Sequence, residues 1–193
     1  MDFCQTRTYK NLMAAFAGES QARNRYTFYG EVAGEQGLPL IKKKFDYIAS
    51  QEQSHAHIFY NHLVEKCNGR NVEFDASYPV DLYQGSTLDN LYAAAKGESF
   101  EHHSLYPSFA EIACQEGFQK IADSFWRIAS VEALHAQVYL GLAKELKDGT
   151  MFRKPYPIDW HCTVCGFVIH GQEAPAKCPN CGHPRGFFQA NCF

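Results

Sequence analysis

The sequence predicts an all-α four-helix bundle followed by a small domain of β and loop structure. Three observations predict it: long segments with apolar residues three and four positions apart, an internal repeat that pairs these segments, and two Cys-x-x-Cys motifs near the C-terminus. A chain of 193 residues holds one core of roughly 100 to 150 residues and a small second unit. We therefore expect a bundle domain over 1–149, a linker over 150–158 and a cysteine domain over 159–193.

The repeat divides the bundle into two equivalent halves. Residues 12–20 (LMAAFAGES) are echoed by residues 91–99 (LYAAAKGES) at an offset of 79. A second stretch repeats at an offset of 80: Ile41, Phe45, Ile48, Glu52, His55 and Phe59 match Ile121, Phe125, Ile128, Glu132, His135 and Tyr139. Each half is therefore expected to be a pair of helices.

Helices are expected at 5–35, 39–67, 87–116 and 118–147, because the matched positions advance by alternating steps of three and four. The helix ends are indicated by Gly37 with Pro39, by Gly69, by an N-cap at Ser86 or Thr87, and by Gly117. Pro107 lies inside the third helix and predicts a kink or a turn there.

The connections between helices predict how they are arranged. The first and third connections are short and produce antiparallel hairpins, whereas 68–85 is long enough to cross the bundle. Pro155 and Pro157 follow the last helix and indicate a linker.

Carboxylates and imidazoles occupy seam positions that the helical pattern reserves for apolar groups. These residues are Glu19, Glu52, His55, Glu98, Glu101, Glu132 and His135. Buried carboxylates need compensation, since an unpaired charge in a core costs several kcal/mol or more. Two divalent cations would supply four positive charges, so the seam predicts a two-metal site.

The spacing Glu-x-x-His places a carboxylate and an imidazole on one helix face, as in Glu52 with His55 and Glu132 with His135. One such motif is usually a solvated surface pair. Two copies in register, with Glu19 and Glu98 at matching places in the partner helices, favour metal binding instead. Oxygen-rich ligation with one imidazole per metal suits iron or manganese better than zinc.

A second metal site is predicted by the cysteine motifs, in which each pair is followed by glycine. The four residues are Cys162, Cys165, Cys178 and Cys181. By spacing alone zinc is the more common occupant, and iron is favoured only because a redox bundle precedes the site. The other cysteines (Cys4, Cys67, Cys114 and Cys192) are expected to be buried small hydrophobes or surface thiols. Metal-bound thiolates imply a reducing compartment.

Charge and hydropathy exclude two classes of partner. The formal net charge is −3, without the basic excess of a nucleic-acid binder. No charged segment followed by an apolar run begins the chain, and no stretch approaches the roughly 18 apolar residues of a membrane span. We therefore expect no nucleic acid and no membrane as partner, and a cytoplasmic location.

The Gly-Glu-Ser repeats, the paired Glu-x-x-His motifs and the Trp160-His-Cys-x-x-Cys-Gly start resemble the rubrerythrin family over essentially the whole chain. The resemblance implies a ferritin-like bundle and a rubredoxin-like domain with three irons per chain. Two irons would be bridged by Glu52 and Glu132, with Glu19 and Glu98 as terminal ligands and His135 on one of them. On the other iron, His55 would bind in the ferrous state and Glu101 would replace it on oxidation.

The same resemblance implies further roles. Glu101 and His55 would act in catalysis, and Tyr26 and Tyr106 match tyrosines that lie beside the ligands, although packed core tyrosines are nearly as good an interpretation of either. The implied function is a peroxidase that reduces hydrogen peroxide to water. Its electrons would pass through the iron of the four-cysteine site from a separate NAD(P)H-linked reductase or a rubredoxin. A head-to-tail homodimer or higher homo-oligomer is expected. A ferroxidase that stores iron and a zinc-ribbon interaction module are the alternatives.

Overall fold

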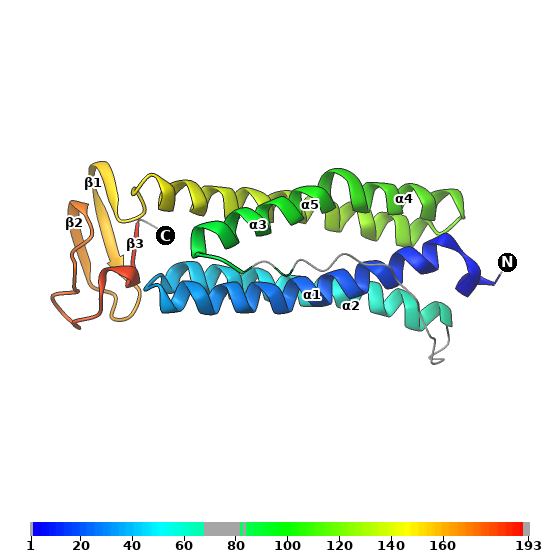
Figure 1. Cartoon of the computed structure of the whole chain (residues 1–193), viewed down its shortest axis with the longest axis horizontal. Coiled ribbons are helices and arrows are strands. Elements are labelled where there is room, and N and C mark those ends of the chain that lie inside the picture. Colours follow the sequence, from blue (N-terminus) through cyan, green and yellow to red (C-terminus); the bar gives the residue numbers. More distant parts are fainter. Residues whose placement is uncertain (1, 68–81, 83, 191–193) are drawn as a thin grey trace.

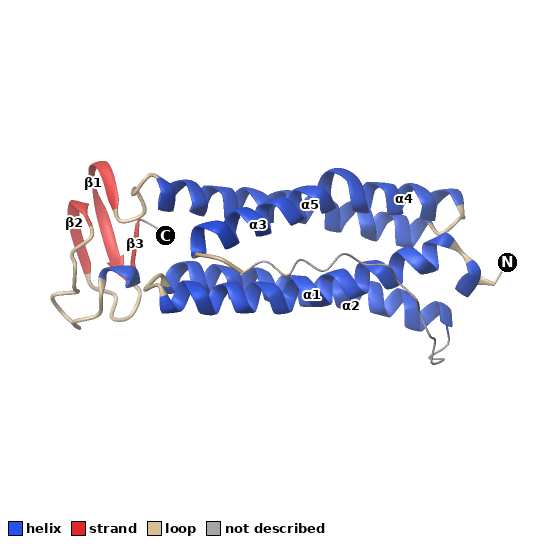
Figure 2. Cartoon of the chain, in the orientation of Figure 1, coloured by secondary structure: helices blue, strands red, loops and turns tan. Residues whose placement is uncertain are grey.

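The computed structural model describes residues 2–67, 82 and 84–190, and forms an elongated helical bundle with a small sheet at one end (Figures 1 and 2). The helices of the bundle are α1 (Arg7–Glu35), α2 (Pro39–Cys67), α3 (Thr87–Phe100), α4 (Tyr106–Gln115) and α5 (Gln119–Lys147). A 3-10 turn, η1 (Phe3–Gln5), precedes α1, and a π-helical turn, η2 (Glu101–Leu105), joins α3 to α4. The predicted fold class is confirmed.

The first hairpin consists of α1 and α2. Its first helix begins at Arg7 rather than near residue 5, because the Thr6 hydroxyl accepts a hydrogen bond from the Tyr9 N–H and caps the helix there. Gly37 adopts a φ of +75°, a left-handed conformation that ends α1, and Pro39 begins α2.

The second hairpin consists of α3, η2 and α4 packed with α5. Ser86 is the N-cap of α3 and forms a capping box with Asp89. The helical path then continues to Gln115, so Pro107 does not end the helix. It lies just after the π-turn, in which the Tyr106 N–H bonds to the Glu101 carbonyl. The wider turn relieves the clash that the Pro107 ring would make in a regular α-helix.

The two hairpins are joined by the segment between α2 and α3. The end of α2 and the beginning of α3 lie toward opposite ends of the bundle (Figure 1). Most of the expected crossing segment 68–85, including Gly69, lies outside the described residues. In the described part of the chain, no helix is both long and apolar enough to cross a membrane.

The core of the bundle is divided into two apolar clusters. One is centred on Leu12, Phe59 and Phe125 and includes η1. The other is centred on Phe45 and Tyr139 and lies toward the sheet. The buried glutamates and histidines of the bundle lie between these clusters.

The small domain is a three-stranded antiparallel sheet of order β2-β1-β3, formed by β1 (Arg153–Cys162), β2 (Val168–Glu173) and β3 (Phe188–Ala190). Its first strand begins inside 150–158, the segment expected as a linker. Pro155 and Pro157, which lack an N–H, lie where the pairing of β1 with β2 is irregular. Buried Trp160 donates from Nε1 to the Gly171 carbonyl at 3.0 Å and anchors the domain core.

Candidate metal centres

The bundle brings six of the seven predicted ligands together between its two apolar clusters. Glu19 comes from α1, Glu52 and His55 from α2, Glu98 from α3, and Glu132 and His135 from α5. All six are at most 6% exposed. Burial of four carboxylates in a protein core requires a compensating positive charge.

The six residues form two groups that share two members. Glu19, Glu52, His55 and Glu132 form one group, and Glu52, Glu98, Glu132 and His135 form the other. The ligand atoms of each group lie within 4.8 Å of one another. Glu52 and Glu132 belong to both groups, which is the arrangement expected of carboxylates that bridge two metal ions.

Hydrogen bonds alone do not satisfy this cluster. His55 Nδ1 lies 3.0 Å from both Glu52 Oε2 and Glu132 Oε1, yet a ring nitrogen carries only one proton. Among the described side chains, both oxygens of Glu132, one oxygen each of Glu52 and Glu98, and Nδ1 of His135 make no hydrogen bond. Hard oxygen donors with one imidazole per group therefore fit two iron ions.

Shifted pKa values show the same electrostatic demand. Burial raises the pKa of Glu19 and Glu98 well above the usual carboxyl range. Glu52 differs: burial alone would raise its pKa, but the adjacent imidazoles of His135 and His55 outweigh burial and lower its pKa to about 2. His135, although burial opposes its charged form, has its pKa raised to about 12 by Glu132, Glu52 and Glu98. The cluster therefore retains positive charge strongly.

One contact of this site was missed by the sequence analysis. The side-chain oxygen Oε1 of Gln51 lies 3.0 Å from Nε2 of His135, and because an amide oxygen only accepts, the imidazole donates this hydrogen bond. With the Nε2 proton held by Gln51, Nδ1 faces Glu132 and Glu52 and is the nitrogen at which a metal ion would take the place of a proton. Val131 is the equivalent of Gln51 in the second half of the repeat, so the repeat contains no signal for this role.

Tyr26 and Tyr106 connect the two hairpins through the site. The Tyr26 hydroxyl donates to Glu98 Oε1 at 2.5 Å, and the Tyr106 hydroxyl donates to Glu19 Oε1. Both tyrosines are fully buried, and burial together with nearby carboxylates raises the pKa of each phenol well above its usual value. Both therefore remain protonated donors to carboxylates that each belong to a single group.

Glu101, the seventh predicted ligand, lies outside both groups. It begins the π-turn η2 and is partly buried, and burial next to Glu19, Glu98 and Glu132 raises its pKa well above the usual range. The π-turn also explains why the repeat offset changes. Glu98 matches Glu19 at 79, whereas Tyr106 matches Tyr26 at 80, so the second half has one additional residue between them. A π-turn accommodates such an insertion without ending the helix.

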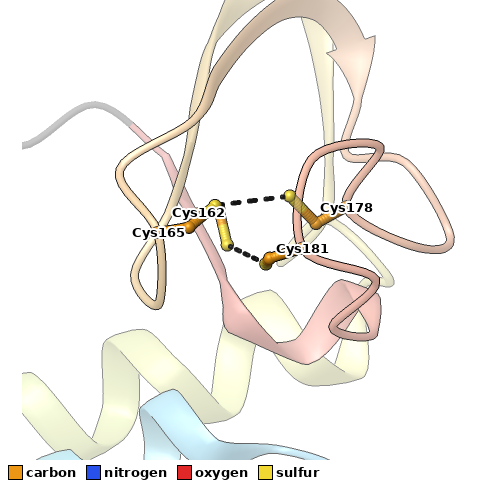
Figure 3. Close-up of side chains that lie close together, drawn as sticks. All are labelled: Cys162, Cys165, Cys178 and Cys181. Carbon is orange, nitrogen blue, oxygen red and sulfur yellow. Dashed lines mark hydrogen bonds between the residues drawn. The ribbon is translucent and has the colours of Figure 1, made fainter.

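The four predicted cysteines meet in the small domain (Figure 3). Sγ of Cys162 lies 3.7 Å from Sγ of Cys181, and Sγ of Cys165 lies 3.7 Å from Sγ of Cys178. Four sulfurs about 2.3 Å from a central ion would be about 3.8 Å apart in a tetrahedron. The distances therefore fit a tetrahedral site of four cysteines.

Two glycine turns shape this site. Gly166 and Gly182 have φ values of +73° and +76°, and their N–H groups bond back to the Cys162 and Cys178 carbonyls. Hydrogen bonds from the Asn180 side chain and the Phe167 N–H lower the pKa of Cys165 to about 6, which favours the thiolate that a metal binds.

A carboxylate-rich ferritin-like bundle joined to a rubredoxin-like four-cysteine domain defines a class of iron-binding proteins, and the residues present fit three irons per chain. The sequence profile of the rubrerythrin domain matches residues 10–143, and that of the rubrerythrin rubredoxin-like domain matches residues 160–189. The chain belongs to the rubrerythrin family, as its motifs predicted.

Individual relatives agree with this assignment. Rubrerythrin of Porphyromonas gingivalis is 46% identical over 95% of this chain and 90% of its own length. Rubrerythrin of Clostridium perfringens is 44% identical over 95% of this chain and 94% of its own length. Among solved structures, nigerythrin in a mixed-valence state superposes with a TM-score of 0.66 at 29% identity, covering 99% of this chain and 94% of that one.

Proposed function

We propose that this chain is a peroxidase that reduces hydrogen peroxide to water with electrons delivered through the iron of its four-cysteine site, and so protects against oxidative stress. The observation that carries the proposal is that two four-residue groups share Glu52 and Glu132 in a chain that also contains a four-cysteine site. A two-metal site can take part in a two-electron reaction, and an iron bound by four cysteines passes one electron at a time.

The reaction consumes one peroxide, two electrons and two protons, and releases two waters. When bound, the paired irons supply the two electrons that break the O–O bond. The protein supplies position and protons. Tyr26 and Tyr106 keep their hydroxyl protons and donate hydrogen bonds to Glu98 and Glu19, so one oxygen of each carboxylate is held in place. The apolar clusters on either side limit the access of water.

Glu101 is proposed to serve the oxidised site. His55 belongs to a ligand group, whereas Glu101 lies beside that group on the π-turn. Ferric iron prefers oxygen donors more strongly than ferrous iron does, so an additional carboxylate would stabilise the oxidised product. Glu101→Ala should therefore still bind two ferrous ions in the bundle but turn over peroxide poorly.

This role has a matched test. Replacing the exposed Glu111 of α4 by alanine changes the net charge equally and should leave peroxide turnover unchanged. Placing a carboxylate at the equivalent position of the first half, by Ala22→Glu, should not improve turnover, because α1 has no π-turn there. Wild-type oxidation rates in Glu101→Ala would make the residue a buried spectator.

Electron entry through the four-cysteine domain also suggests a homodimer. Along α2, the rise from Pro39, beside the small domain, to Glu52 in the bundle site is about 20 Å. Electron transfer slows steeply with distance, so it would be faster in a head-to-tail dimer that brings the four-cysteine iron of one chain near the bundle of the other. We expect a reductase or a rubredoxin as the external electron donor, and a reducing, cytoplasmic setting in which the thiolates persist.

An iron-storing ferroxidase is the alternative function for such a bundle. The four-cysteine domain favours the peroxidase, because iron storage driven by oxygen does not need electrons to be returned to the bundle site. The test is to supply the iron-loaded protein with a reductant and either hydrogen peroxide or ferrous iron and oxygen. We expect peroxide consumption that depends on Glu52 and Glu132 and no accumulation of mineral. Faster ferrous oxidation with mineral growth and little peroxide turnover would favour storage.

A zinc-ribbon interaction module is the second alternative. Iron bound by four thiolates absorbs visible light, whereas zinc does not. A red protein that loses colour on reduction and regains it with peroxide supports the proposed electron path. A colourless protein with zinc at the four cysteines would refute this path.

A further inference from the structure

Two cysteines that neither metal centre uses lie against each other at the far end of the bundle. Cys4 belongs to η1, and Cys67 is the last residue of α2. Their Sγ atoms are 3.3 Å apart, although the residues are separated by 63 positions in the chain. A disulfide bond is about 2.0 Å long, so small rotations of the two side chains would bring the sulfurs to bonding distance.

The segment that carries Cys4 is held in place by several contacts. The Asp2 side chain accepts a hydrogen bond from the Cys4 N–H at 3.2 Å, and the Thr6 hydroxyl donates to the Phe3 carbonyl at 2.7 Å. The Phe3 ring packs edge to face on Phe118 at 5.1 Å between ring centroids. The short approach of the thiols is therefore built into the fold of this end of the bundle.

The two thiols differ in access. Cys67 is 4% exposed and packs in the apolar cluster around Leu12 and Phe59, whereas Cys4 is partly exposed at its edge. A small oxidant can reach Cys4 first, and Cys67 lies directly behind it. Such a pair, one accessible sulfur and one adjacent sulfur, is the arrangement in which an oxidised thiol is captured as a disulfide.

We propose that Cys4 and Cys67 are a peroxide-sensitive thiol pair that closes to a reversible intramolecular disulfide. The Cys4 sulfur attacks one oxygen of hydrogen peroxide, the O–O bond breaks, and Cys4 becomes a sulfenic acid as one water leaves. The Cys67 sulfur then attacks the Cys4 sulfur, the S–O bond breaks, and the second water leaves. In total, two thiols and one peroxide give one disulfide and two waters. A dithiol reductant returns the pair to thiols by exchange.

The disulfide would join η1 to the end of α2 and so tie the N-terminal turn to the first hairpin. Because a crosslink between residues 4 and 67 encloses both helices of this hairpin, it would restrict the unfolded chain strongly. The closed form should therefore resist unfolding more than the thiol form, which would protect the protein when peroxide is present.

The test treats the iron-loaded full-length protein with hydrogen peroxide and analyses it by mass spectrometry without reduction. We expect a peptide that contains Cys4 linked to Cys67, a loss of two hydrogens from that pair, and full reversal by dithiothreitol. The melting temperature of the oxidised protein should rise by about 5 °C or more. Cys4→Ser should abolish both the linked peptide and the rise, whereas Cys114→Ser, at an exposed cysteine elsewhere, should retain both.

A second variant separates the two chemical steps. In Cys67→Ser, Cys4 should stop at the sulfenic acid, which dimedone traps, and should proceed to higher oxides with excess peroxide. If this variant is too unstable to purify, the Cys4→Ser result still decides, because Cys4 lies at the edge of the cluster. Oxidation of wild-type Cys4 to sulfinic acid without the Cys67 link, links only between chains, or unreacted thiols after peroxide treatment would each overturn the proposal.

Discussion

Gly186 is a point of close approach between the small domain and the bundle. A Cβ at this position would lie 2.2 Å from the Gly37 carbonyl oxygen and 2.8 Å from Cδ of Pro39. Ordinary carbon to oxygen contacts begin near 3.3 Å, so Gly186→Ala would force a displacement of about 1 Å. Neither neighbour can yield easily, because one is backbone in a left-handed turn and the other begins α2.

The displacement should fall on the contact between the two domains. Overpacking of this kind costs about 1–3 kcal/mol, and the small domain can relieve the clash by moving off the α1–α2 turn. The equilibrium between docked and undocked domains would then shift by roughly 5- to 150-fold. The two apolar clusters of the bundle are untouched by the substitution, so global unfolding of the bundle should change little.

Hydrogen exchange and limited proteolysis measure this shift. In Gly186→Ala, exchange should accelerate in β3 and in the turn around Gly37, and cleavage should increase between α5 and β1. The visible colour of the iron at the four-cysteine site should remain, which distinguishes undocking of the small domain from its unfolding. Gly171→Ala is the matched control in the same domain, since its Cβ would meet only the Glu173 carbonyl at 3.8 Å.

Equal exchange and cleavage in Gly186→Ala, Gly171→Ala and the wild type would refute the reasoning. Such a result would mean that the α1–α2 turn adjusts without cost and that Gly186 does not set the position of the domain. Loss of iron colour in Gly186→Ala alone would also contradict it, because the alanine would then disturb the cysteine site itself.

Three further predictions follow from individual contacts. Cys178→Ser should remove the visible absorption of the iron at the four-cysteine site while leaving the bundle irons in place, as measured by visible spectra and metal analysis. Ser86→Ala removes the cap of α3 and should lower the free energy of unfolding by about 1 kcal/mol in denaturant titrations. Glu116→Gln should lower it by about 1 kcal/mol at neutral pH, because the Glu116 carboxylate accepts from the Arg7 and Thr8 N–H groups at the start of α1. Although desolvation opposes it, hydrogen bonds to Thr8 and Arg7 lower the pKa of Glu116, so this stabilisation is present above the ordinary carboxyl pKa, is lost as the pH falls through the lowered value, and should be missing from Glu116→Gln at every pH.

Much of the fold could be predicted because the repeat and the helical period act together. The α2 and α5 seams show the same apolar spacing, and two helices that bury Glu52 and Glu132 at matched positions are hard to explain without metal ions. The domain limits and the individual roles of the site residues remain predictions. The tyrosine contacts agree with their place in the repeat, although spacing alone did not separate a packed tyrosine from one that donates to Glu19 or Glu98.

Other features depend on contacts between distant segments, which spacing does not encode. Pro107 signalled a disturbance in the third helix, but the π-turn before it became evident only in the structure. Pro155 and Pro157 suggested a linker, whereas pairing of Arg153 and Ile158 with β2 draws this segment into β1. The sequence does not single out Gln51, and only the approach of α5 makes it a partner of His135.

Iron analysis tests directly whether Glu132 is shared between the two bundle irons. Anaerobic loading of the wild type and of the surface control Glu111→Ala should give three irons per chain, two of them in the bundle. Removal of a shared carboxylate by Glu132→Ala should release both bundle irons together, leaving one coloured iron at the four cysteines and no peroxide turnover. Three irons in Glu132→Ala, or the loss of a single bundle iron with the other fully retained, would contradict a shared ligand at this position.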